Sequence, residues 1–449
     1  MLRWILGGRE TQGPVEKTTV LLIGEEQPKN SYTELQVLKG HFDIVRFLVQ
    51  IDDFRFASAG DDGLVLVWNV QTGERLQELR GHTQQVTAIT AFQKHGAKSG
   101  SAAVITASSD RTVSLWDIET GNRVQTVSEL QSSVKCLLVL ERLDLWLSGG
   151  NELCVWNGNF QLLCKTDHYN DAGIAAMVEL PKNCIAAAVD KELIIYRLTV
   201  SESETSIQEI RRLASHQDSI RALITVNDQM FASGSHIGEL IVWDSLDWSI
   251  QIYERDFWDS AQMDTQPEIK LTSQKHSAMS IQHMTSDGEY IVAAIGSGLY
   301  IYNILTKNVA AYRKTAHDST ILHTLLLPDS QLISCSEDGT VRMWELQDLP
   351  LAAEPASSGF FGMWGFGRAG KQPHQQVKKV AESCSLRTLE LRGDLVGHSG
   401  AVQMFLHFKD IGLVTCSTDH LLILWKDGEK ELRLRSLALF HKLEQSQGL

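Results

Sequence analysis

The stretch that decides the fold is Ser58–Trp68, which reads SAGDDGLVLVW. It joins small residues to an acidic turn and then to alternating apolar residues that end in an aromatic side chain. Three other stretches repeat this pattern closely: TASSDRTVSLW at Thr106–Trp116, SCSEDGTVRMW at Ser334–Trp344 and TCSTDHLLILW at Thr415–Trp425. Weaker copies end at Trp156, Tyr196, Trp243 and Tyr302. This recurrence indicates a repeat architecture.

The spacing and periodicity of the copies indicate the kind of repeat. Five of the seven intervals between the aromatic endings lie between 40 and 48 residues, and a four-stranded propeller blade occupies about 40–45 residues. Each copy alternates with period 2 beside a turn rich in Gly, Asp or Asn, which predicts antiparallel strands. One such sheet cannot bury both of its faces, whereas a ring of sheets covers them all. We therefore expect an all-β propeller of eight blades.

Short motifs around the strong copies narrow this expectation. Gly-His dipeptides precede three of them, at positions 40–41, 81–82 and 397–398, and Ala316-His317 is a close variant. In each strong copy an Asp lies six residues before the Trp, and a Ser or Thr lies four residues before that Asp. These residues resemble the WD40 family, and the resemblance implies four structural tetrads joined by hydrogen bonds. The tetrads are His41, Ser58, Asp62 and Trp68; His82, Thr106, Asp110 and Trp116; His317, Ser334, Asp338 and Trp344; and His398, Thr415, Asp419 and Trp425.

The same residue types could be mistaken for a hydrolase triad. Four copies at near-constant spacing favour a scaffold, in which Asp fixes the His tautomer and the hydroxyl links His to the indole N–H. The sequence has no H-x-x-x-H, Walker or Cys/His metal spacing. We expect a protein that is not an enzyme and has no catalytic residue, metal site or cofactor.

The weaker copies depart from the motif. The expected Asp position is Ile237 in the copy ending at Trp243, although His216 and Ser233 remain, and it is Gly150 or Gly296 in two others. Tyr replaces Trp in the copies that end at 196 and 302. We therefore expect half of the blades to lack the full network and to depend on apolar packing.

Ring closure has its own sequence signal. Tyr32–Leu38 alternates and leads into Gly40-His41, as an outer strand would, but no earlier strands of its blade precede it. It is therefore expected to pair with the last blade, whose Trp425 strand lies near the C-terminus.

Composition limits the function. Acidic residues outnumber basic ones by 55 to 41, which gives a net charge of -14 and disfavours nucleic-acid binding. Seven cysteines without a C-x-x-C pair indicate reduced thiols of a cytoplasmic protein. No apolar run approaches the roughly 18 residues of a membrane span, so no direct transmembrane segment is expected.

Three segments remain outside ordinary blades. Residues 1–30 are expected to be an extension with an edge strand at Thr18–Ile23, and residues 31–429 the propeller. Residues 430–449 are expected to form a helical tail. In that tail Leu439, Phe440 and Leu443 lie at helical spacing, and they could pack either on the propeller itself or on a partner.

The third segment is an insertion within residues 345–391, where a typical blade has a short turn. Its centre is rich in aromatic side chains and glycine, and the residues proposed to contact a partner are Phe360, Phe361, Met363, Trp364, Phe366 and Arg368. Such a segment could cap one mouth of the ring, insert into a cavity of a partner or wedge into a membrane interface.

The MWGFGR sequence at Met363–Arg368, the IGEE sequence at Ile23–Glu26 and the YTEL sequence at Tyr32–Leu35 also resemble one subfamily of WD40 propellers. That resemblance implies a cytoplasmic adaptor recruited to the lysosomal surface, with roles in autophagy and small-GTPase regulation. The implied partners are two longin/DENN-domain proteins, the chromosome 9 open reading frame 72 protein and the Smith-Magenis syndrome chromosome region 8 protein. A PQ-loop lysosomal cationic amino-acid transporter is implied as the partner of the 355–380 loop. A substrate receptor of a ubiquitin ligase is the alternative.

Overall fold

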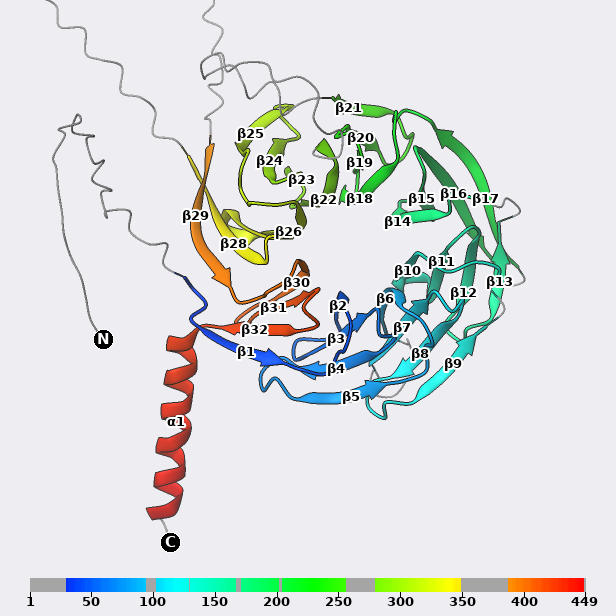
Figure 1. Cartoon of the computed structure of the whole chain (residues 1–449). Coiled ribbons are helices and arrows are strands. Elements are labelled where there is room, and N and C mark those ends of the chain that lie inside the picture. The colour runs from blue at the N-terminus through cyan, green and yellow to red at the C-terminus, as the bar shows by residue number, and fades with distance from the viewer. Residues whose placement is uncertain are drawn as a thin grey trace, which may run out of the picture.

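The chain folds into a ring of eight antiparallel sheets, each with four strands (Figure 1). The computed structural model describes residues 30–93, 102–128, 130–166, 171–201, 204–255, 279–348 and 387–447, with side chains of the last helix described up to residue 439. The expected eight-bladed β-propeller is therefore confirmed. The suggested edge strand at Thr18–Ile23 and the aromatic centre of the insertion lie outside the described residues.

Blades one to four follow one another along the chain, each as a meander of four strands. Blade one contains β2 (Val45–Gln50), β3 (Arg55–Gly60), β4 (Val65–Asn69) and β5 (Arg75–Leu79); blade two contains β6 (Val86–Gln93), β7 (Ala102–Ser108), β8 (Val113–Asp117) and β9 (Arg123–Val127). Blade three contains β10 (Cys136–Leu140), the short helix η1 (Glu141–Leu143), β11 (Leu145–Gly149), β12 (Leu153–Asn157) and β13 (Leu162–Lys165). Blade four contains β14 (Ile174–Leu180), β15 (Cys184–Val189), β16 (Glu192–Val200) and β17 (Thr205–Leu213).

Blades five to seven continue the same pattern. Blade five contains β18 (Ile220–Asn227), β19 (Met230–Ser235), β20 (Leu240–Asp244) and β21 (Ile250–Glu254); blade six contains β22 (Ile281–Ser286), β23 (Tyr290–Ile295), β24 (Gly298–Asn303) and β25 (Asn308–Arg313). Blade seven contains β26 (Ile321–Leu327), the short helix η4 (Pro328–Ser330), β27 (Gln331–Ser336), β28 (Thr340–Asp348) and β29 (Arg387–Val396). The insertion lies between β28 and β29.

Blade eight combines the two ends of the chain. It contains β30 (Val402–Phe408), β31 (Gly412–Ser417) and β32 (Leu422–Lys426), and its outer strand is β1 (Glu34–Leu38). The register places Leu35 opposite Trp425 and Leu38 opposite Leu422. The predicted closure by an N-terminal strand is confirmed.

The hydrophobic core lies between blades rather than within one of them. Each of the eight buried clusters draws side chains from two neighbouring sheets. Leu38 and Phe408 of blade eight, for example, pack in one cluster with Leu48 and Phe56 of blade one. Because a sheet is apolar on both faces, each blade depends on both of its neighbours.

The ring has two distinct faces. One, here called the tetrad face, carries the loops that hold the histidines of the strong repeats. The other, here called the insertion face, carries the turns between first and second strands, such as 51–54, and the two ends of the insertion at Asp348 and Arg387.

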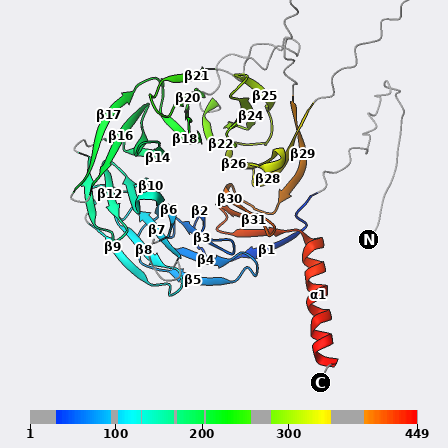
Figure 2. The ribbon, with the colours of Figure 1, turned by 180° about the vertical axis from the view of Figure 1, so that it is seen from behind.

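The C-terminal helix also starts on the insertion face. Helix α1 (Gly428–Gln447) follows β32 and projects away from the ring (Figures 1 and 2). Asp427 caps its first turn, since Oδ1 accepts hydrogen bonds from the N–H groups of Glu429 (3.0 Å) and Lys430 (3.1 Å). The predicted tail helix is confirmed. In the described part of the chain, the helices are too short or too polar to span a membrane.

Candidate functional site

The structure brings together all four predicted tetrads. In each one, His Nδ1 lies 2.8–3.1 Å from the Asp carboxylate and His Nε2 lies 2.7–2.8 Å from the hydroxyl of Ser or Thr. The Trp Nε1–H donates to the same hydroxyl at 2.8–3.0 Å. Because the indole only donates and the carboxylate only accepts, His Nδ1 carries the proton and the hydroxyl donates to Nε2.

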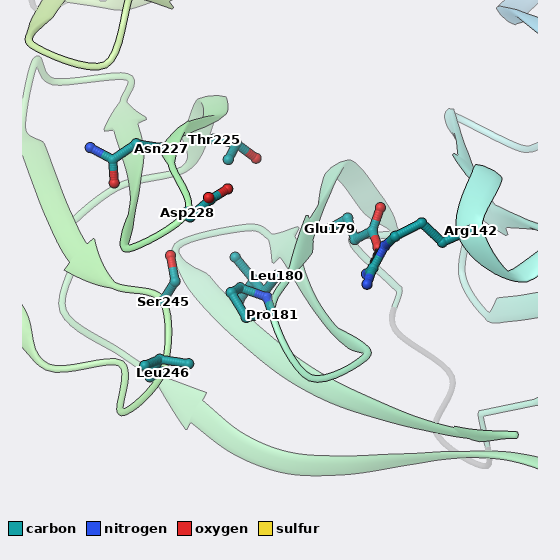
Figure 3. Close-up of a pocket in the computed structure, with 9 residues that line it drawn as sticks. All are labelled: Arg142, Glu179, Leu180, Pro181, Thr225, Asn227, Asp228, Ser245 and Leu246. Carbon is teal, nitrogen blue, oxygen red and sulfur yellow. Dashed lines mark hydrogen bonds and ion pairs between the residues drawn. The ribbon is translucent and has the colours of Figure 1, made fainter.

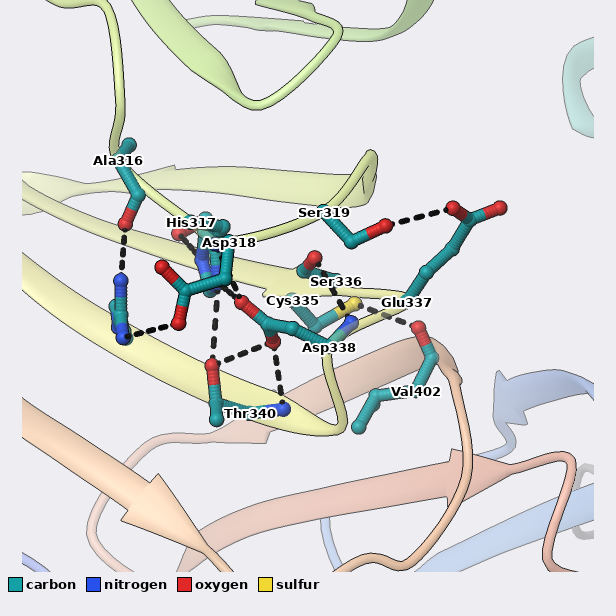
Figure 4. A network of polar contacts seen from close by, with 12 residues as sticks. Ala316, His317, Asp318, Ser319, Cys335, Ser336, Glu337, Asp338, Thr340 and Val402 are labelled. Atoms are coloured by element: carbon teal, nitrogen blue, oxygen red, sulfur yellow. Dashed lines mark hydrogen bonds and ion pairs between the residues drawn. The ribbon is translucent and has the colours of Figure 1, made fainter.

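Blade seven shows how the carboxylate is held (Figure 4). Asp338 accepts hydrogen bonds from His317, from the hydroxyl of Thr340 at 2.7 Å and from the backbone N–H of Asp318 at 3.0 Å. Burial alone would raise the pKa of Asp338, but these hydrogen bonds outweigh it and hold the pKa well below its usual range. The aspartate is therefore an ionised acceptor that fixes two loops of one blade.

Blade five corrects an expectation from the sequence. The Asp position there is Ile237, but Glu239 supplies the carboxylate instead, with Oε2 3.2 Å from His216 Nδ1. Ser233 Oγ lies 2.7 Å from His216 Nε2 and accepts the Trp243 indole N–H at 2.9 Å. The longer side chain of Glu reaches the same point from a position two residues later. The prediction that this blade lacks a full network was wrong.

The remaining blades are held by packing and by other polar contacts. In blade three Trp146 stacks on Trp156 with ring centroids 5.1 Å apart, and Trp156 Nε1–H donates to Ser148 at 2.9 Å. In blade six the Tyr302 hydroxyl donates to Glu254 of blade five at 2.9 Å. This last contact ties two blades together instead of fixing one.

Two further features of the described residues concern metal binding and thiol chemistry. No group of three or more His, Cys, Asp or Glu side chains in the described residues could hold a metal ion. Burial raises the pKa of Cys136 and of Cys416 to about 12 and that of Cys154 to about 11, so these thiols stay protonated at neutral pH.

Helix α1 is the candidate functional site. Four of its leucines are more than half exposed: Leu432 (62%), Leu434 (51%), Leu437 (56%) and Leu439 (61%). Leu439 was predicted from its spacing, whereas the side chains of Phe440 and Leu443 lie outside the described residues. The ring leaves these four leucines uncovered, which excludes self-docking for the part of the tail that is described.

The base of the helix is fixed to the closure of the ring. Thr33 N–H donates to Lys426 O at 3.1 Å, and Gly428 N–H donates to Thr33 Oγ1 at 3.1 Å. Arg435 of the helix forms an ion pair with Glu34 of β1. Beside this junction β1 exposes Leu35 and Val37 (51% and 41%). We call β1 and α1 together the seam surface; its β1 part was not predicted, because Tyr32–Leu38 indicated only a strand.

Comparison with known proteins identifies the family. A family model of the WDR41 β-propeller matches residues 1–435. The chain belongs to the WDR41 β-propeller family. It is 60% identical to WD repeat-containing protein 41 of Homo sapiens over 453 residues, which cover 99% of this chain and 98% of that protein. The protein of the same name from Mus musculus is 58% identical over the same lengths.

A solved structure shares the fold. The computationally designed protein Ika8 aligns with 87% of this chain and 98% of its own length, with a TM-score of 0.62 and 20% sequence identity. At that identity the likeness shows the propeller fold alone. For this WDR41-family chain, a non-catalytic WD40 scaffold agrees with the family and with the geometry of the networks.

The network of blade five generates a stability prediction. Replacing Glu239 by Ala removes the carboxylate that accepts from His216 Nδ1–H and from the Gln217 N–H, which should cost about 1–3 kcal/mol of unfolding free energy. Chemical denaturation of the full chain measures this loss. Glu337→Ala, at an exposed position on the equivalent loop of blade seven, is the control. Equal effects of the two substitutions would refute the network.

The networks also predict how stability depends on pH. Burial lowers the pKa of His82, His216 and His398 from 6.5, and the nearby carboxylates offset this only in part. The neutral histidines contribute stability that is present above pH 6.5 and is lost as pH falls below it. The carboxylates, whose pKa values are lowered from 3.8 or 4.5, add a further loss below those values.

The melting temperature should therefore fall as the pH is lowered from 7.5 to 5, a range that spans the ordinary His pKa of about 6.5. Differential scanning calorimetry measures this change. Charge repulsion alone predicts the opposite, because acidification approaches the isoelectric point near 5.5. A melting temperature that rises or stays constant over this range would contradict the assignment of neutral, buried histidines.

Proposed function

We propose that this chain is a non-catalytic adaptor subunit of a complex with two longin/DENN-domain proteins, and that it recruits the complex to the lysosomal surface in support of autophagy and small-GTPase regulation. The named partners are the chromosome 9 open reading frame 72 protein and the Smith-Magenis syndrome chromosome region 8 protein. Kinship with WD repeat-containing protein 41 supports the scaffold role. The partners and the location rest on the resemblance described above.

The observation that carries the adaptor role is the uncovered helix. Most of the stability of a helix in a protein comes from packing of its apolar side chains, and the four exposed leucines of α1 gain nothing until a partner covers them. Burying a leucine side chain contributes about 1.5–3 kcal/mol. The partner that covers α1 would also reach Leu35 and Val37, because Arg435 holds the first turns of the helix against β1.

The second attachment point is the insertion. Its ends, Asp348 and Arg387, leave blade seven on the insertion face, the face from which α1 also starts. The aromatic residues Phe360, Phe361, Trp364 and Phe366 would enter a cavity of the PQ-loop transporter, with Arg368 as the cation. Because these two segments are different parts of the chain, assembly and recruitment are separable.

Two variants test this separation in cells. The double substitution L432S/L439S should abolish co-purification of the DENN-domain proteins, because it removes apolar surface that a partner must bury. The triple substitution W364A/F366A/R368A should leave that co-purification intact and abolish lysosomal recruitment, scored by imaging. Leu305→Ser, at a site 77% exposed on blade six, is the control for a lost surface leucine.

Each arm has an outcome that rejects the proposal. Retention of the DENN-domain proteins by L432S/L439S would show that α1 is not their site. Unchanged lysosomal recruitment of the triple variant would remove the role of the insertion. A ubiquitin-ligase core as the stable partner, identified by mass spectrometry, would favour the substrate-receptor alternative.

A further inference from the structure

A cleft opens on the insertion face between blades four and five (Figure 3). It has a volume of about 640 Å³ and lies far along the ring from the seam surface. One wall is formed by the end of β14 and by Pro181, and the other by the end of β18 and Asp228 together with Ser245 and Leu246 after β20. The walls therefore combine apolar surface with two carboxylates, those of Glu179 and Asp228.

Ser245 is the unusual residue of this cleft. It is only 2% exposed, and its Oγ is buried without a hydrogen-bond partner. Its backbone is fixed, because Ser245 N–H donates to Gln229 O at 2.7 Å. In Figure 3 the hydroxyl points toward Asp228. A buried hydroxyl without a partner costs free energy, and a donor that enters the cleft would relieve that cost.

The charges of the cleft are unbalanced. Glu179 forms an ion pair with Arg142, which lies at the edge and is 65% exposed. Asp228 is exposed, and no cation among the described residues forms an ion pair with it. Asn227 cannot supply a free acceptor, because its Oδ1 already accepts the N–H groups of Gln229 and Met230. The exposed Asp228 carboxylate thus has no ion-pair partner among the described residues, and the buried Ser245 hydroxyl has no hydrogen-bond partner.

An equivalent cleft of the same ring also carries one arginine, but in a different arrangement. Between blades six and seven, a cleft of about 640 Å³ is lined by Asp287, Glu289 and Asp329 together with Arg387. The guanidinium carbon of Arg387 lies 5.4 Å from the centre of the Tyr290 ring. In the cleft between blades four and five, the lining cation Arg142 is paired with Glu179, so Asp228 has no ion-pair partner among the described residues.

We propose that the cleft between blades four and five binds an arginine side chain of a partner protein. The guanidinium donates to the Asp228 carboxylate and, after rotation of χ1, to Ser245 Oγ. Its methylene groups pack on Pro181 and Leu246. Arginine is preferred over lysine because its planar group presents several donors in fixed directions, whereas an ammonium is a point charge. This site involves neither α1 nor the insertion, so it stands independently of the function proposed above.

The test selects peptides from a random phage-displayed library against the full-length chain. The expected result is enrichment of arginine at one position of the selected peptides. Replacing that arginine by lysine should weaken binding by about tenfold, measured by fluorescence anisotropy of the labelled peptide. Selection without enrichment of arginine would overturn the proposal.

Two variants of the chain locate the site. Asp228→Asn should weaken binding of the selected peptide by about tenfold, whereas Asp329→Asn, the same loss of charge on the equivalent turn of blade seven, should change it by less than about twofold. Equal losses would show attraction to the acidic face in general and would overturn the site.

Ser245→Ala should weaken peptide binding without lowering the melting temperature, because the free protein loses only an unpaired hydroxyl. A lower melting temperature with unchanged affinity would assign Ser245 a structural role and overturn its part in binding.

Discussion

The pairing of β1 with β32 is the constraint on which the rest of the structure depends. Every buried cluster is shared by two neighbouring blades, so an open ring would expose the inner faces of blade eight and blade one to water. Leu38 and the backbone ladder of β1 close that gap and complete the interface between the last and the first blade, which joins the seven interfaces between consecutive blades. A pairing of five residues thus joins the two ends of the chain into a closed ring.

The same pairing determines where the molecule can act. Because β1 and β32 belong to one blade, the start of β1 and the start of helix α1 lie at one junction, where Arg435 forms an ion pair with Glu34. The hydrogen-bonded networks fix the loops of five blades, but they lie on the tetrad face and their polar groups are already paired with one another. Surfaces that remain available are the exposed leucines of α1 and the clefts of the insertion face. This division is consistent with the proposed scaffold, which would have several separate attachment points.

The fold was predictable because its signals are local. Its signals are short sequence patterns that can be recognised without knowing any tertiary contact. They are the Gly-His dipeptides, the Asp six residues before the Trp of each strong repeat, and the alternation of Tyr32–Leu38. The network of blade five was missed because Glu239 reaches His216 from a different register, which only the loop geometry reveals. The cleft between blades four and five could not be foreseen either, since Asp228 and Ser245 meet only after two turns of blade five have packed beside Pro181 of blade four.

The most direct test of the account compares two leucines of β1. Leu38 is 2% exposed and Leu35 is 51% exposed, although both belong to the same five-residue strand. Denaturant unfolding followed by tryptophan fluorescence should show that Leu38→Ala lowers the unfolding free energy by about 2–5 kcal/mol, while Leu35→Ala changes it by less than about 0.5 kcal/mol. If Leu38→Ala were as mild as Leu35→Ala, closure by β1 would not control the stability of the ring.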